Sequence, residues 1–112
     1  MRGAFTAAAK RDLNAIIEYI ALDNPAAAEK VFRAIVAVTP HLADFPEMGH
    51  AGRLPGTREL AVAGLPCLIV YQVTRNAVTI IAVFHGARDL PRLLADRRRG
   101  RKHPRPALRT PR

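Results

Sequence analysis

Residues 53–88 contain the side chains that could carry out acid–base or phosphate chemistry. They comprise three arginines, a glutamate, a tyrosine and a histidine: Arg53, Arg58, Glu59, Tyr71, His85 and Arg88. Cleavage of RNA through its own 2′-hydroxyl needs a base for the 2′ proton, cations for the pentavalent phosphate and an acid for the leaving 5′ oxygen. If these residues formed one site, Glu59 or His85 would act as the base, and Arg58 or Arg88 would clamp the phosphate.

Each candidate also has a structural interpretation, and we favour that one. Arg58 and Glu59 are neighbours on a predicted strand, so their side chains point to opposite faces of a sheet and do not easily serve one site. Tyr71 is expected to be a core residue with a satisfied hydroxyl, and His85 a hydrogen-bonding histidine at the end of a strand. Arg88 and Asp89 are expected to form an ion pair or to cap the turn.

The charge of the chain is unevenly distributed. Its net charge is +9, yet residues 1–96 hold ten Lys or Arg and nine Asp or Glu, whereas residues 97–112 hold eight Lys or Arg and no acid. Three prolines, a glycine and self-repelling charges predict a disordered basic tail over 97–112. The tail could attract phosphate. We favour a solvated extension, because no aromatic residue lies among its charges to stack bases.

The first half of the chain predicts two helices. Thr6 is a good N-cap for a helix that runs to about Leu22. Asp12 lies off the apolar stripe of this helix and is expected on its wet face. The pair Asn24-Pro25 caps and begins a second helix that ends near Ala43. The connection is so short that the two helices should form an antiparallel hairpin.

Beyond residue 56 the hydrophobic pattern changes to that of strands. Strands are expected near 58–62, 68–73 and 78–84, with a hairpin turn at 74–77. The last two strands are apolar on both faces, so one face can pack on the helices while the other needs a second cover. A short C-terminal segment and a partner chain could supply that cover, the segment through Leu90, Leu93 and Leu94. The predicted fold is α+β: one domain, residues 1–96, with an antiparallel helical hairpin on a small antiparallel sheet of three to four strands.

The remaining sequence features exclude several classes of site. A single cysteine, Cys67, rules out an internal disulfide and a Cys-rich zinc site, and its apolar surroundings predict a buried small side chain. No apolar run is long enough to span a membrane, and no signal peptide is evident. We therefore expect a cytoplasmic protein without a metal or other cofactor.

Seven short segments together resemble one protein family. In order they are AKRDL (9–13), IEYI (17–20), NPAAA (24–28), PEMG (46–49), GTREL (56–60), IVYQV (69–73) and VFHGARD (83–89). Each motif is weak alone, but their order and spacing resemble the RelE/ParE superfamily of type II toxin–antitoxin systems. The residues of the GTREL segment and the spacing from His85 to Arg88 more closely resemble the ParE branch, which includes plasmid stabilisation proteins.

The resemblance implies a toxin that a small antitoxin wraps and neutralises. ParE-like members inhibit DNA gyrase, and this is the function we expect, with Arg58 and Arg88 contacting the target and Leu90, Leu93 and Leu94 contacting the antitoxin. Two alternatives stay open. One is a RelE-like nuclease that cuts mRNA on the ribosome, with Arg58, Glu59, His85 and Arg88 in the site. The other is a non-toxic relative that only binds an antitoxin.

Overall fold

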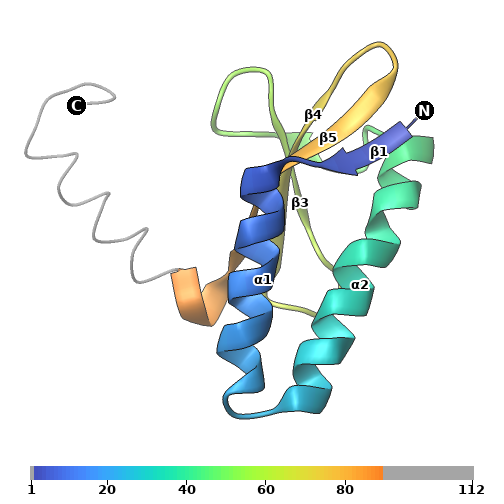
Figure 1. The fold of residues 1–112 in the computed structure, drawn as a ribbon. Coiled ribbons are helices and arrows are strands. Elements are labelled where there is room, and N and C mark those ends of the chain that lie inside the picture. Colours follow the sequence, from blue (N-terminus) through green and yellow to red (C-terminus); the bar gives the residue numbers. More distant parts are fainter. Residues whose placement is uncertain (1, 90–112) are drawn as a thin grey trace, which may run out of the picture.

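The structure, a computed structural model, describes residues 2–89; Met1 and residues 90–112 lie outside it. Two helices cover one face of a five-stranded sheet (Figure 1). The elements are β1 (Arg2–Phe5), α1 (Ala7–Ala21), α2 (Pro25–Asp44), β2 (His50–Ala51), β3 (Arg58–Ala61), β4 (Cys67–Val73) and β5 (Ala77–His85). The expected α+β architecture, with a helical hairpin on a sheet, is thereby confirmed, whereas the predicted tail 97–112 falls outside the described residues.

The helix starts follow from local chemistry. The Thr6 side chain accepts a hydrogen bond of 3.1 Å from the Ala9 backbone N–H at the start of α1. The Asn24 side chain does the same for the Ala27 N–H, also at 3.1 Å, with Pro25 in the first helical position. Both caps satisfy backbone donors that have no partner inside the helix. The predicted boundaries of the two helices are therefore confirmed to within a residue or two.

The sheet is larger than the sequence indicated. Its strand order is β1-β5-β4-β3-β2, with β1 parallel to β5 and every other neighbouring pair antiparallel. The prediction of a purely antiparallel sheet with three to four strands was wrong in both respects. The two strands beyond the three with predicted ranges are short, with four residues in β1 and two in β2. Segments this short carry too few alternations to be recognised as strands.

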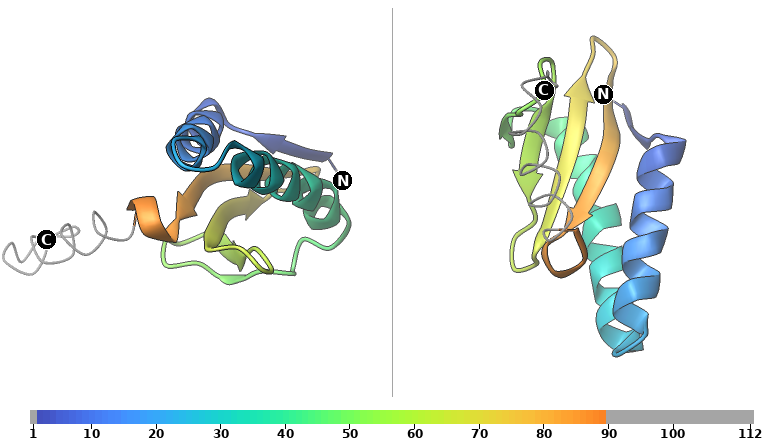
Figure 2. Two further views of the ribbon diagram at one scale, coloured as in Figure 1. Left: turned by 90° about the horizontal axis from the view of Figure 1, so that it is seen from below. Right: turned by 90° about the vertical axis from the view of Figure 1, so that its left-hand side faces the viewer.

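Figure 2 shows both helices on one side of the sheet, and the hydrophobic core lies between the helices and that sheet face. The helices contribute Leu13 and Ile35, and β4 and β5 contribute Ile69, Tyr71 and Ile80, all buried. The predicted turn between β4 and β5 is confirmed, since the Thr74 N–H donates to the Ala77 carbonyl over 2.8 Å.

Helix α1 also completes the sheet beyond the end of β1. The last residue of β1, Phe5, pairs with Ile80, so the following part of β5 lacks a neighbouring strand on that side. There the Asp12 carboxylate accepts a hydrogen bond of 3.1 Å from the Val83 backbone N–H. The expectation that Asp12 lies on the wet face was wrong, because an unpaired strand edge beside a helix leaves a partly buried backbone donor that a side chain of the helix can satisfy.

Candidate functional site

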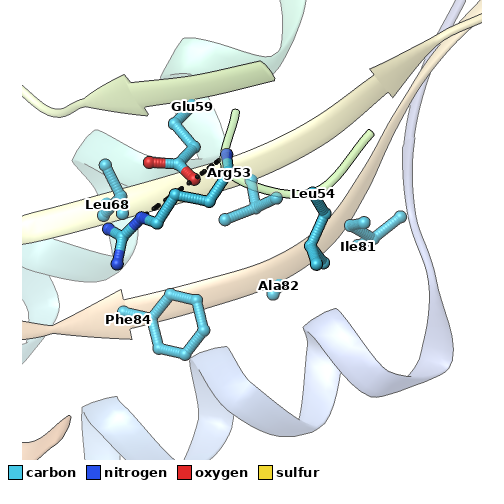
Figure 3. A pocket seen from close by; sticks show the side chains of 8 residues that line it. Arg53, Leu54, Glu59, Leu68, Ile81, Ala82 and Phe84 are labelled. Atoms are coloured by element: carbon cyan, nitrogen blue, oxygen red, sulfur yellow. Dashed lines mark hydrogen bonds and ion pairs between the residues drawn. The ribbon is translucent and has the colours of Figure 1, made fainter. Parts of the chain in front are cut away.

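An apolar groove lies on the sheet face that the helices leave open. It has a volume of about 280 Å³. Its walls come from three strands and the loop before β3, through Arg53, Leu54, Glu59, Leu68, Val70, Ile81, Ala82 and Phe84. Figure 3 shows the Arg53–Leu54 segment lying over the strands, with Phe84 and Leu68 at the same end as the Arg53 guanidinium. The loop covers part of the second face, so Val70 is buried there, and the rest stays open.

Among the described residues, Glu59 is the one carboxylate in the groove wall. Its Oε2 atom accepts a hydrogen bond of 3.0 Å from the Arg53 backbone N–H and lies 3.5 Å from the Arg53 Nε atom. The hydrogen bond from the Arg53 backbone holds the pKa of Glu59 below its ordinary value of 4.5, against the opposing effect of burial. Glu59 is therefore a carboxylate near neutral pH, and it anchors the loop to the sheet.

Arg58 and Tyr71 hold a second loop, on the helix side of the sheet. They face each other across β3 and β4. The Tyr71 hydroxyl donates to the Pro46 carbonyl over 2.7 Å and accepts from the Gly49 N–H over 3.0 Å. The Arg58 guanidinium donates to the Gly49 carbonyl over 2.5 Å. The core position and satisfied hydroxyl predicted for Tyr71 are confirmed, and Arg58 has a structural contact.

His85 and Arg88 lie at the far end of β5. The Nδ1 atom of His85 is 3.4 Å from the Arg88 N–H, and its ring lies 6.1 Å from the ring of Tyr19 on α1. The Asp89 carboxylate accepts from the His85 N–H over 2.7 Å and pairs with the Arg88 guanidinium at 2.8 Å. The predicted ion pair between Arg88 and Asp89 is confirmed. Cys67, opposite His85 on β4, is buried as expected, and burial raises the pKa of its thiol.

The four candidate groups do not all converge on one point: His85 lies beside Arg88, but Glu59 and Arg58 lie elsewhere on the sheet. Glu59 lies on the open face, whereas Arg58 and His85 lie on the helix face. The strand partners of Arg58 and His85 are Tyr71 and Cys67, which are separated by about 13 Å along β4 at 3.3 Å per residue. Among residues 2–89, no group of three or more His, Cys, Asp or Glu side chains is placed to hold a metal ion.

The structure also revealed groove residues that the sequence interpretation had not named. Leu54, Leu68 and Phe84 form much of the open-face wall. The signal for Leu68 and Phe84 was present, because strands apolar on both faces imply a second buried or binding surface. Leu54 gave no such signal, since it lies in a loop rich in glycine and proline. The residues predicted to contact an antitoxin, Leu90, Leu93 and Leu94, lie outside the described residues.

Comparison with known proteins assigns the fold to a family. The family model described as "ParE toxin of type II toxin-antitoxin system, parDE" matches residues 4–90. The chain belongs to the ParE toxin family. It is 38% identical over 90 residues to the Sinorhizobium fredii protein named "Putative toxin Y4kP", a match that covers 80% of this chain and 93% of that protein.

A solved structure from a ParDE toxin–antitoxin system has the same fold. It is a chain from the "Chromosomal ParDE TA system from P. aeruginosa", with a TM-score of 0.67, 26% sequence identity and coverage of 76% of this chain and 95% of that one. The chain is thus a ParE-type toxin of a type II toxin–antitoxin system. No helix within the described part of this ParE toxin is long and apolar enough to cross a membrane.

Proposed function

We propose that this ParE toxin inhibits DNA gyrase by binding it, without chemistry of its own, and that a cognate antitoxin neutralises it. Binding would stabilise a cleaved gyrase–DNA intermediate and so trap DNA breaks. The observation that carries this proposal is the separation of the candidate catalytic groups: Glu59 on one face of the sheet, and Arg58 and His85 at different positions on the other.

The separation matters because proton transfer requires contact. A general base must lie within about 3 Å of the proton it removes, or reach it through one water molecule. Glu59 cannot work with Arg58 or His85 across a sheet, and the about 13 Å between the strand positions of Arg58 and His85 exceeds the span of one phosphate. A mechanism that needs only surface complementarity has no such requirement.

The charge distribution supports the same proposal. Residues 2–89 carry nine Lys or Arg and eight Asp or Glu, so the part of the chain that the structure describes is close to neutral. A nuclease working on ribosomal RNA and mRNA would engage a polyanion over a wide surface, for which a neutral domain is poorly suited. The basic residues of 97–112 could instead add contact to DNA held by gyrase.

Arginines and apolar residues are the usual anchors of protein interfaces. We propose that Arg58 and Arg88 contribute to the target contact. Arg58 would act through the loop whose carbonyls it holds, and Arg88 through the surface beside its ion pair with Asp89. Since gyrase is a cytoplasmic enzyme, this function also places the action of the toxin in the cytoplasm.

The antitoxin is proposed to bind the open sheet face together with Leu90, Leu93 and Leu94. The apolar groove supports this, because an exposed apolar surface on a strand pair suits an apolar helix or strand from a partner. Changing Leu93 and Leu94 together to Glu should weaken the complex with the product of the adjacent antitoxin gene. A complex as tight as that of the wild type would contradict this assignment.

Supercoiling of relaxed plasmid by purified gyrase tests the main proposal. Purified toxin should block the reaction, and Arg58→Ala or Arg88→Ala should weaken the block. Cleavage of mRNA in a stalled ribosome, lost in Glu59→Ala or His85→Ala while gyrase is untouched, would replace the proposal with the nuclease. A chain that affects neither system yet binds its antitoxin would be a non-toxic binding module.

A further inference from the structure

The loop between α2 and β2 exposes two large apolar side chains. Phe45 has 63% of its surface exposed and Met48 has 48%. They border a shallow hollow of about 460 Å³, lined by the consecutive residues Asp44–Met48. Because both side chains line one hollow, they form a contiguous apolar surface of the kind that can bind another protein.

The backbone beneath these side chains is held firmly. The Tyr71 hydroxyl binds both ends of the segment Pro46–Gly49, and Arg58 binds the Gly49 carbonyl and, at 3.4 Å, the Glu47 carbonyl. Gly49 is packed so tightly that a Cβ atom there would lie 2.5 Å from the carbonyl oxygen of Glu59. Because the loop is already ordered, a partner that binds it loses little conformational entropy, which favours tight binding.

We propose that Asp44, the last residue of α2, and the loop Phe45–Met48 that follows it form a target-binding surface of this toxin. The partner it fits is a protein surface with an apolar recess and a basic rim. The recess would take Phe45 and Met48, and the rim would face the exposed carboxylates of Asp44 and Glu47. This inference rests on the proposed function, because gyrase holds DNA and a surface that holds a polyanion is basic.

Two other occupants fit the surface less well. A second copy of the chain would bring Asp44 and Glu47 against their own counterparts, and like charges at close range disfavour contact. The antitoxin is proposed on the apolar groove, which lies on the open face, whereas the loop is held by Arg58 and Tyr71 on the helix face. The loop thus stays free for the target.

The test compares a double variant, Phe45→Ser with Met48→Ser, with the matched control Leu22→Ser. Leu22 is 83% exposed at the end of α1, so the control removes exposed apolar surface elsewhere. Two activities are measured: growth arrest on induced expression, and inhibition of gyrase supercoiling of relaxed plasmid. The loop variant should need roughly tenfold more protein for half-inhibition of gyrase and should lose growth arrest, while Leu22→Ser stays like the wild type.

A charge variant tests the same surface independently, in case the double serine variant fails to fold. Asp44→Lys with Glu47→Lys leaves both apolar side chains in place and should also lose growth arrest, because it places like charge against a basic rim. Thermal unfolding by circular dichroism identifies variants that fail to fold. Growth arrest at the wild-type level in either folded variant overturns the inference. Growth arrest by the wild type without gyrase inhibition would overturn the proposed function. The inference about the loop would survive that result if both loop variants lost growth arrest, because the target contact would still lie on this loop.

Discussion

Replacing Tyr71 with Phe removes one buried hydroxyl and keeps the ring. Tyr71 is completely buried, and its hydroxyl makes hydrogen bonds of 2.7 Å to the Pro46 carbonyl and 3.0 Å to the Gly49 N–H. The substitution leaves these two backbone groups without that partner inside the protein, which costs about 1–3 kcal/mol of unfolding free energy. For a domain of this size, a loss of about 2 kcal/mol lowers the melting temperature by roughly 8–16 °C.

The measurement is thermal unfolding of the full chain followed by circular dichroism. Tyr19→Phe is the matched control, because Tyr19 is 44% exposed and its substitution keeps the ring beside His85. We expect Tyr71→Phe to melt well below both the wild type and this control. If Tyr71→Phe melted within about 2 °C of the wild type, the hydroxyl would not hold the loop, and the rigidity assigned to residues 46–49 would be refuted.

Three further substitutions test other parts of the fold. The pKa of Glu59 is lowered in the folded state, so its stabilising contribution is present above the unfolded pKa near 4.5 and is lost as the pH falls through the lower folded value. Glu59→Gln should therefore cost stability in urea unfolding at pH 7, and progressively less as the pH falls below 4.5. Gly49→Ala should destabilise by about 1–3 kcal/mol because its Cβ meets the Glu59 carbonyl at 2.5 Å, whereas Gly86→Ala, with 3.5 Å to its nearest atom, should be tolerated; equal urea midpoints would contradict this. Asp12→Ala should speed hydrogen exchange of the Val83 amide, and Asp12→Asn, which keeps an acceptor oxygen, should do so less; unchanged exchange in Asp12→Ala would exclude the carboxylate as the partner.

Local patterns were sufficient for the helices, the turn and the two central strands. Thr6, Asn24 and Pro25 predict the helix starts because capping depends on side chains within three residues of the backbone groups they satisfy. The alternation of β3 likewise predicted that Arg58 and Glu59 face opposite sides of the sheet, which the register confirms. Burial of Cys67 and Tyr71 followed from apolar neighbours in the chain.

The family, too, was indicated by short motifs in a fixed order, and the match over residues 4–90 confirms it. These motifs did not reveal which contacts their individual residues make. Arg58 and Tyr71 could be read as parts of a site from their types alone, and the structure instead joins both to the loop 46–49. A side chain's partner can be far away in sequence: Tyr71 bonds to residues 22 and 25 positions before it.

Only the tertiary structure decided which groups meet. The parallel pairing of β1 with β5, the bond from the Asp12 carboxylate to the Val83 N–H and the loop folded over Glu59 all join segments whose local patterns give no sign of each other. The physical reason is that each contact satisfies a donor or acceptor that the pairing of neighbouring strands leaves without a partner. These unpaired groups exist only once the whole sheet has formed. The sequence by itself determined the helices, strands β3 to β5 and the family; the assembled sheet determined that Glu59, Arg58 and the adjacent pair His85 and Arg88 lie apart.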